Sequence, residues 1–444
     1  MIKKGNKKII RGWVFYDWAN SVYNLVISSA IFPIFYDNIT TQRYLDKHGL
    51  ESMPVGQDVM VDFMGYEFTN SSLIAYVLSA SFLIVSILSP MLSGVADFSG
   101  SKKRFMQFFC YLGALSCLTL YWFNEVPLEI GMLSIFLASI GFWNSLVFYN
   151  AYLPEIAEPE DHDRISARGF SMGYFGSMIL LVICLGIIMF TGENGSNTPY
   201  CFLLVGVWWI GFSQITYRVL PSNVYERKKE KGVVWKGFKE LQIVFKEFKK
   251  TKRLKRYLTS FFFFNTGVQT VMLMAVIFAK KEIAWPEGGG DTGLIVAILL
   301  IQILGAAGAF LMSRLSGIIG NIKTLGISVT LWVIICLAAY VVETPVQFYV
   351  LASSVGLVMG GVQALARSTY SKFLPETQDH ASYFSFYDVT EKLGIVLGTF
   401  TFGFLDNFLG SIRYSVISIA VFFCIGLILL FFVPKYEKLK PAAS

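Results

Sequence analysis

Long apolar segments recur along the whole chain, and they restrict the available folds more than any other feature. A helix of about 20 apolar residues crosses the hydrocarbon core of a bilayer, and twelve such segments can be drawn here. Only 15% of the 444 residues are charged, whereas soluble domains average about 25%. We therefore predict an all-α, polytopic membrane protein. The predicted spans are residues 12–36, 72–96, 105–124, 128–152, 168–191, 200–220, 257–280, 292–312, 324–342, 346–371, 383–406 and 411–433.

The second half of the chain repeats landmarks of the first half at a nearly constant offset. Two connections share three residues that lie 220 positions apart: Ser93, Gly100 and Lys103 correspond to Ser313, Gly320 and Lys323. Internal repeats of this kind are typical of transporters built from two related bundles. We predict two six-helix halves, residues 1–220 and 257–444, joined by a basic connection at 221–256.

Lysine and arginine residues gather on one side of the predicted membrane. Of the 37, 31 lie in connections or at span ends on the side of the N-terminus, and Lys392 lies in the interior of a span. Those on the other side are Arg43, Lys47, Lys280, Lys281 and Arg413. Basic connections tend to stay cytosolic, so both termini and the central connection are expected on the cytosolic side. The expected membrane is a bacterial inner membrane. This asymmetry accounts for the net charge of +7, so we expect no nucleic-acid partner.

The central connection contains an amphipathic pattern. Its apolar residues recur at helical spacing with lysines between them: Trp235, Phe238, Leu241, Val244, Phe245 and Phe248. A helix of this kind suits the surface of an anionic leaflet. We prefer this interpretation to an unstructured tether.

Residue types for metal, disulfide or enzymatic chemistry are sparse. The six cysteines show no C-x-x-C pair and fall mostly within apolar runs, which is typical of core residues. His48, His162 and His380 are predicted to lie in loops, so no histidine relay is expected in the membrane. No nucleophile–base pair or phosphate-binding loop is evident. We expect no enzymatic activity, no cofactor and no metal.

The first predicted span carries a stripe of polar and amphipathic residues. At about 100° per residue, its members share one arc of the helix: Trp13, Tyr16, Asp17, Asn20, Tyr23 and Asn24. Hydrocarbon penalises such a stripe, so it must face other helices or a cavity. Interhelical hydrogen bonding is one interpretation. We favour a cavity for a small polar solute, because one member of the stripe is ionisable.

The connection after the second span resembles the major facilitator superfamily signature, G-x-x-x-D-R-x-G-R-R. Four residues match it: Asp97, Gly100, Lys102 and Lys103. Ser93 replaces the leading glycine, and Phe98 replaces the arginine. An acid at a helix end can hold the positive N-terminus of a neighbouring helix, and the resemblance implies that Asp97 does so at the eleventh span. The copy after the eighth span has Gly317 in place of the acid, so we expect its clamp to be degenerate.

Further blocks resemble the vacuole-effluxer-like branch of that superfamily. They include Y-D-W-A-N-S at 16–21, F-Y-N-A-Y-L-P-E at 148–155 and Q-A-L-A-R-S at 363–368, so the resemblance covers both halves. It implies the major facilitator fold, with 12 transmembrane helices in two pseudo-symmetric six-helix halves. The fungal members are described as exporting amino acids from the vacuole. An amino-acid-like substrate is therefore the first expectation.

The eleventh predicted span carries charges inside the membrane. Asp388 and Lys392 are four residues apart and can pair along the helix, and Glu391 lies on the same side. One interpretation is a neutralised cluster that locks helices together, and the other is a carboxylate that loads a proton. Asp17 enters its span at a similar depth, so the two sites are also candidates for an inner gate.

Other polar residues lie on helices expected to line the cavity. Arg367 is a candidate to bind an anionic substrate group, or to pair with Glu376 or Asp379 in a gate. The candidate substrate-binding residues are Tyr16, Asn20, Tyr23, Asn24, Asn144, Tyr149, Asn265, Gln269, Gln363 and Arg367. The candidates for proton coupling or gating are Asp17, Asp388, Glu391 and Lys392.

These patterns predict a secondary active transporter that moves a small polar or amphipathic solute by alternating access. The solute, the lipid bilayer and protons are the expected partners, and a monomer is the superfamily default. Efflux of lipophilic compounds is the alternative within transport. A non-transporting receptor or scaffold that signals through the central connection is the alternative from another class.

Overall fold

The computed structural model describes residues 4–53, 58–191, 197–227, 233–286, 290–409 and 412–434. In the first half the long helices are α1 (Lys7–Val22), α2 (Ile31–His48), α3 (Asn70–Ser99), α4 (Lys102–Thr119), α5 (Leu128–Asn150), α7 (His162–Thr191) and α8 (Thr198–Val219). The second half contains α10 (Lys252–Glu282), α11 (Gly290–Ile319), α12 (Asn321–Ala339), α13 (Pro345–Phe373), α14 (His380–Leu409) and α15 (Ile412–Phe431). The remaining elements are the helix of the central connection, α9 (Val233–Lys250), the π-helix η1 (Tyr23–Ala30), the 3-10 turns η2 (Leu120–Trp122) and η3 (Pro159–Asp161), α6 (Leu153–Ile156), and the strands β1 (Met60–Phe63) and β2 (Tyr66–Thr69).

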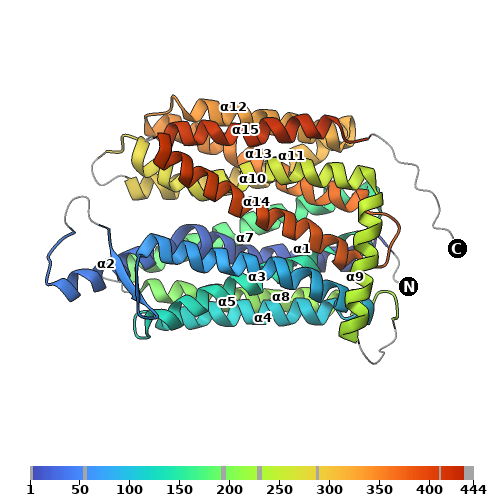
Figure 1. The fold of residues 1–444 in the computed structure, drawn as a ribbon, viewed down its shortest axis with the longest axis horizontal. Helices are drawn as coiled ribbons and strands as arrows, with labels where there is room; N and C mark the ends of the chain where they lie inside the picture. Colours follow the sequence, from blue (N-terminus) through green and yellow to red (C-terminus); the bar gives the residue numbers. More distant parts are fainter. Residues whose placement is uncertain are drawn as a thin grey trace.

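The two halves form two stacks of roughly parallel helices (Figure 1). At one end of the molecule α9 crosses both stacks, and α1 begins and α15 ends there. At the opposite end α2 and the antiparallel β1–β2 hairpin project beyond the bundle. We call these two ends the linker face and the hairpin face.

The predicted spans correspond to long helices in the structure. Within the described ranges, eleven helical segments are long and apolar enough to cross a membrane. α14 is a twelfth helix of similar length, and it carries three charged residues close together within the segment: Asp388, Glu391 and Lys392. The all-α class and the two-bundle architecture are therefore confirmed. Several helices extend past their predicted ends, because their polar last turns project beyond the apolar segment.

Local sequence signals mark the helix ends. Thr344 and Gln347 form a capping box at the start of α13, where each side chain bonds the backbone of the other residue. Gly100 ends α3 at φ +62°, in the left-handed region that favours glycine. The backbone N–H of Ser101 then bonds the carbonyl of Ala96. Gly100 and this hydrogen bond fix the tight turn between α3 and α4.

The first transmembrane segment is interrupted by the π-helix η1. The wider π turn includes Tyr23 and Asn24, and Ser29 Oγ donates a hydrogen bond of 2.9 Å to the carbonyl of Asn24. π-helical turns are rare and often occur at functional sites. The sequence pattern predicted a regular helix through this stretch, so the interruption is a correction.

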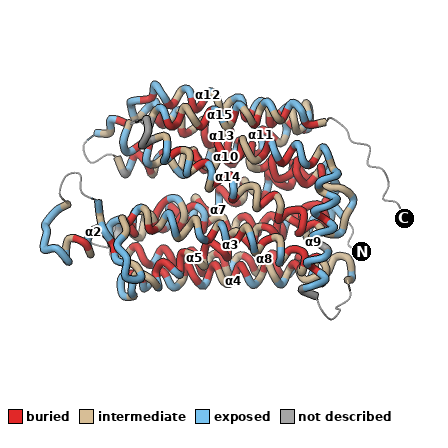
Figure 2. The backbone as a smooth tube through the Cα atoms, viewed as in Figure 1, coloured by how far each residue is buried: buried red, intermediate tan, exposed pale blue. Residues whose placement is uncertain are grey.

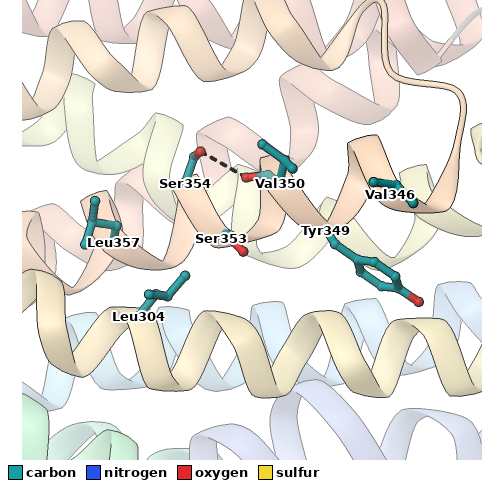
Figure 3. A pocket seen from close by; sticks show the side chains of 7 residues that line it. All are labelled: Leu304, Val346, Tyr349, Val350, Ser353, Ser354 and Leu357. Atoms are coloured by element: carbon teal, nitrogen blue, oxygen red, sulfur yellow. Dashed lines mark hydrogen bonds between the residues drawn. The ribbon is translucent and has the colours of Figure 1, made fainter.

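Buried residues gather between the helices, and many residues on the outer surfaces are exposed (Figure 2). Large apolar side chains face outward in both halves, including Val207 at 61% and Phe400 at 71% exposure. A surface of this kind suits contact with lipid tails, since hydrocarbon imposes no penalty on exposed apolar groups. One shallow outer hollow lies beside α11 and α13 (Figure 3), lined by Leu304, Val346, Tyr349, Val350, Ser353, Ser354 and Leu357.

The central connection forms a helix over Val233–Lys250, so the unstructured tether is wrong for these residues. Residues 228–232 of the connection lie outside the described part of the chain. The rings of Phe245 and Phe248 pack on Phe386 of α14, at centroid distances of 5.7 Å and 5.4 Å. Trp235 at the other end is 72% exposed. The apolar side of α9 is thus shared between protein contacts and exposed surface.

Candidate functional site

A cavity of about 460 Å³ lies between the two halves. Its wall is built from α1, η1, α2, α3, α5 and α7 of the first half and from α10, α13 and α14 of the second. The cavity begins at Asp17 and Arg367 and reaches Ile74 and Thr399, which lie nearer the hairpin-face ends of their helices. This volume falls in the range of small-molecule sites.

Most of the candidate site residues meet at this cavity, although their helices lie far apart in the sequence. The lining includes Asp17, Asn20, Tyr23, Asn24, Asn265, Gln269, Gln363, Arg367 and Glu391. Aromatic side chains that sequence reasoning did not single out complete the wall: Phe82, Phe142, Trp143 and Phe170. The cavity therefore combines amides and charges with apolar walls.

Three candidate substrate-binding residues do not line the cavity. Tyr16 is fully buried within the first half, with its ring 5.0 Å from that of Tyr149. Tyr149 also stacks on Trp13 at 4.5 Å, and its hydroxyl donates to Asp17 Oδ2 at 2.8 Å. Asn144 accepts a hydrogen bond from Ser89 inside the same half. The arc drawn on the first span was too broad, because Trp13 and Tyr16 pack inward behind Asp17, whereas Tyr23 lines the cavity.

Asp17 and Arg367 form an ion pair that joins the two halves at the linker-face end of the cavity. Arg367 Nη2 lies 3.1 Å from Asp17 Oδ2. The guanidinium also donates to Ser166 Oγ at 3.0 Å, to the Ser166 carbonyl at 3.1 Å and to Asn150 Oδ1 at 3.3 Å. Arg367 was expected to meet a substrate anion or to pair with Glu376 or Asp379. In this structure its partner is Asp17.

The charged cluster on α14 lies farther along the cavity wall. Lys392 is fully buried, 2.9 Å from Asp388 and 3.2 Å from Glu391, and its ammonium lies 3.5 Å from the centre of the Trp143 ring. Asp388 also accepts from Ser89 of α3 at 3.1 Å, which links the two halves. Glu391 accepts from Gln269 of α10 at 3.0 Å and faces the cavity. Asp388 and Lys392 lie behind the cavity wall.

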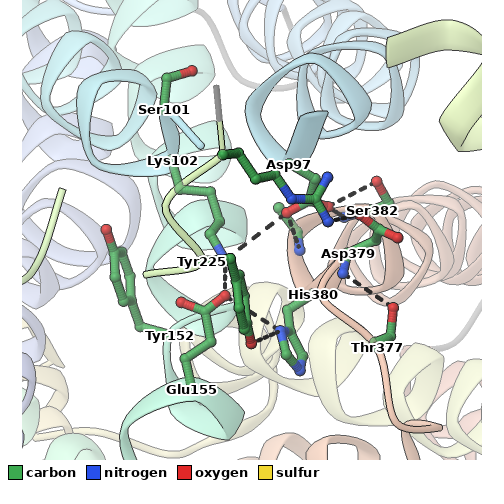
Figure 4. Close-up of polar contacts among 12 residues, drawn as sticks. Asp97, Ser101, Lys102, Tyr152, Glu155, Tyr225, Thr377, Asp379, His380 and Ser382 are labelled. Carbon is green, nitrogen blue, oxygen red and sulfur yellow. Dashed lines mark hydrogen bonds and ion pairs between the residues drawn. The ribbon is translucent and has the colours of Figure 1, made fainter. Parts of the chain in front are cut away.

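Asp97 clamps the N-terminus of α14 at the linker face (Figure 4). Its carboxylate accepts from the backbone N–H of Ser382 at 2.7 Å and of Ala381 at 3.2 Å, and from the Ser382 hydroxyl at 2.9 Å. A carboxylate is favourable there because it meets unpaired N–H groups at the positive end of the helix. This geometry is the helix-end contact expected for the motif after the second span.

Glu155 of α6 extends this network. It contacts Lys102, and it lies 3.2 Å from Nδ1 of His380. Lys103 donates instead to the carbonyl of Leu220 at 2.8 Å. His162 and His380 are the first residues of α7 and α14 and are buried, and His48 is the last residue of α2. The expectation that the three histidines lie in loops was therefore wrong.

The central connection contributes to the same network. Arg227 donates to Asp379 at 2.7 Å, just before α14 begins. The hydroxyl of Tyr225 lies 3.3 Å from Nδ1 of His380. Burial raises the pKa of Tyr225 to about 12, so it remains a neutral hydroxyl at neutral pH. Both contacts tie the connection to the second half near the clamp.

The motif copy after α11 supplies no acid, as Gly317 predicted, but a second clamp made by side chains joins the halves beside it. Asp163, the second residue of α7, accepts from Ser316 of α11 at 2.8 Å and from Asn321 of α12 at 2.7 Å. Lys372 of α13 pairs with the same carboxylate at 2.6 Å. The acid missing at Gly317 is therefore supplied from the opposite half. Inspection of the motif copies alone could not reveal it, because it lies outside both copies.

Together these contacts hold the two halves against each other at the linker face, while the cavity extends toward the hairpin face. Access to the cavity from the linker face would require the Asp17–Arg367 pair and both clamps to separate.

The vacuole effluxer Atg22-like family model matches residues 5–443, nearly the whole chain. The chain belongs to this family. A similar relative is an uncharacterized MFS-type transporter, YxiO, of Bacillus subtilis (strain 168), 28% identical over 98% of this chain and 96% of its own. Autophagy-related protein 22 of Yarrowia lipolytica is 24% identical over 82% of this chain and 76% of its own.

Solved structures show the same fold as this family member. FucP, a major facilitator superfamily transporter crystallised in the outward conformation, superposes with a TM-score of 0.65 at 14% identity, covering 97% of this chain and 99% of FucP. The proton:xylose symporter XylE gives a TM-score of 0.68 at 13% identity, covering 96% and 95%. The chain is thus an integral, multi-pass membrane protein with the major facilitator fold.

Proposed function

We propose that this protein is a secondary active transporter that moves a small polar, amino-acid-like solute by alternating access. The observation that carries the proposal is the cavity between the halves, which several amide side chains line and which the Asp17–Arg367 pair closes at one end. Rocking of one half against the other around a fixed site is the usual mechanism for a fold of two repeats. The amino-acid-like class is supported by the family relationship.

We further propose that the linker face is cytosolic and that the membrane is a bacterial inner membrane. The excess of lysine and arginine on that side supports this orientation. The structure would then represent a state whose cytosolic side is closed. On this assignment the exposed side of α9, which includes Trp235, contacts the inner leaflet.

Proton coupling is part of the proposal. Asp17 and Glu391 are carboxylates that line the cavity. Asp17 pairs with Arg367 on another helix, and Glu391 pairs with Lys392, the next residue in the chain. A proton on either carboxylate would weaken its ion pair and change the balance between states. In proteoliposomes, Asp17→Asn and Glu391→Gln should abolish the acceleration of transport by an imposed pH gradient. Unchanged acceleration in both variants would refute the coupling.

Efflux of lipophilic compounds is the second candidate. It is favoured by the aromatic part of the wall, which includes Phe82, Trp143 and Phe170. A lipophilic solute would depend on these rings and not on the amides. Loss of binding in Phe170→Ala, with unchanged binding in Asn20→Ala, would favour this candidate.

The experiment that tests the proposal is a thermal-unfolding screen of the purified protein against amino acids, short peptides, sugars and lipophilic amines at two pH values. A solute that binds only the folded state raises the unfolding temperature. A shift with amino acids that is lost in Asn20→Ala and Gln363→Ala would support the proposal. Gln42→Ala, at an exposed position on α2, is the control for Gln363→Ala. Shifts only with lipophilic amines would transfer support to efflux.

A further inference from the structure

We infer that the cavity selects solutes with a protonated amine and a net positive charge, and that Glu391 is their anchor. The inference rests on the proposed function, in which this cavity binds the transported solute. It adds that, among solutes with an amine, the cavity prefers those with a net positive charge to zwitterions.

The first step is the charge of the cavity wall. Asp17 and Arg367 neutralise each other across the halves. On α14, two carboxylates share a single ammonium, since Lys392 lies within 3.2 Å of both Asp388 and Glu391. When all five groups are ionised, the wall keeps one negative charge in excess. A charge of this kind in a low-dielectric site favours a cation.

The second step is that both cations are already paired. Arg367 is 3% exposed, and its donors are directed to Asp17, Ser166 and Asn150. The Lys392 side chain is fully buried between the two carboxylates and the Trp143 ring. Among the described lining residues, a solute carboxylate would therefore meet no unpaired cation. Such a carboxylate would lose its hydration without an ionic partner, which is unfavourable.

The third step locates the negative charge at the cavity surface. Asp388 lies behind the wall, whereas the Glu391 side chain is 17% exposed and lines the cavity. One Glu391 oxygen accepts from Gln269, and the other faces Lys392. Trp143 and Tyr387 also line the cavity. A carboxylate beside aromatic rings is an environment that binds ammonium groups.

The fourth step concerns the uncharged part of the solute. Asn20 and Asn265 line the cavity and are 1% and 4% exposed, and the side-chain amide nitrogen of each has no hydrogen-bond partner. Buried donors are normally satisfied, so these amides suit oxygen acceptors on a ligand. A neutral carbonyl or hydroxyl group fulfils this requirement without the cost of a second charge. The preferred solute thus carries an ammonium and a neutral oxygen.

Amino acids and their primary amides form a matched test. Leucine is a zwitterion, leucinamide keeps the ammonium but not the carboxylate, and N-acetyl-leucine keeps only the carboxylate. Isothermal titration of the purified full-length protein should give leucinamide an affinity at least about tenfold above that of leucine, with no binding of N-acetyl-leucine. The alanine and phenylalanine series should show the same order, because the selection depends on charge.

Variants at Glu391 separate the anchor from a general effect on folding. Glu391→Gln should lower the affinity for leucinamide about thirtyfold, as expected for the loss of one partner of a buried charge pair. Glu391→Asp should retain the preference for the amide over the amino acid. Glu343→Gln makes the same chemical change on an exposed loop residue and should leave binding unchanged.

Binding of leucine as tight as that of leucinamide would overturn the inference. So would a preference for the amide that survives in Glu391→Gln, or the absence of binding by every amide in the three series. If zwitterions bind and are transported while amides do not bind, the transporter proposal stands and only the cation preference fails. If no solute binds or is transported, the proposed function itself fails.

Discussion

Gly169 of α7 lies directly against Asp17 of α1, at the point where the two halves meet. A Cβ atom at position 169 would clash with Asp17 Oδ2 and would lie 2.9 Å from Arg367 Nη2. The ion pair at the end of the cavity therefore depends on the absence of a side chain at this position.

Gly169→Ala should weaken the closed linker face. The added methyl group displaces Asp17 or Arg367, and overpacking of this kind costs about 1–3 kcal/mol. A cysteine at position 20 should then react faster with a membrane-impermeant thiol reagent from the linker face. Gly186→Ala on the same helix is the control, since a Cβ there has no neighbour within 4 Å. Equal labelling rates in the two variants would contradict the prediction.

The two clamps should contribute comparably to stability. Asp163→Ala removes an acceptor shared by Ser316, Asn321 and Lys372, and Asp97→Ala leaves two N–H groups of α14 unpaired. Unsatisfied buried groups cost about 1–3 kcal/mol each, so both variants should unfold at lower temperatures than the parent. Asp161→Ala removes an exposed pair with Arg164 and should change the free energy of unfolding by less than about 1 kcal/mol. If Asp163→Ala behaves like Asp161→Ala, the second clamp carries little energy.

Much of the fold could be predicted because its signals are local. Apolar runs of sufficient length mark the spans, and Gly100 marks the turn after α3. The π-helix η1 had no such signal, because residues 23–30 read equally well as α-helix. The second clamp was missed for another reason. Its acid, Asp163, belongs to the opposite half from Ser316, and only the packing of the halves brings the two residues together.

The candidate site could be predicted only in part, because some of its contacts also depend on how the helices pack. Asn20, Gln269 and Gln363 are polar residues within apolar helices, and they line the cavity. Tyr16 and Tyr149 share this amphipathic character, but they pack against each other within one half. A helical projection cannot distinguish a cavity face from a face buried against a neighbouring helix. The partner of Arg367 also depends on the docking of the halves.

The contact between α9 and α3 should respond to a side chain at position 237. A Cβ atom there would lie 2.7 Å from the backbone of Val95, so α9 reaches α3 only because both Gly237 and Gly94 lack side chains. Gly237→Val should displace α9 and expose the lysine-rich connection to trypsin, which limited proteolysis measures as faster cleavage. Gly317→Val, at a position with open space around it, should leave the cleavage rate unchanged.

The α14 cluster should show strong coupling between its members. Lys392→Met leaves Asp388 and Glu391 without their shared ammonium, and the removal of one partner of a buried pair costs about 3–5 kcal/mol. Adding Asp388→Asn removes one of the two stranded charges and should recover part of that loss, while the amide can still accept from Ser89. A double-mutant cycle on thermal stability measures this coupling. If the losses in Lys392→Met and Asp388→Asn simply add, Lys392 does not neutralise Asp388, and the excess negative charge inferred for the cavity wall would have to be reassigned.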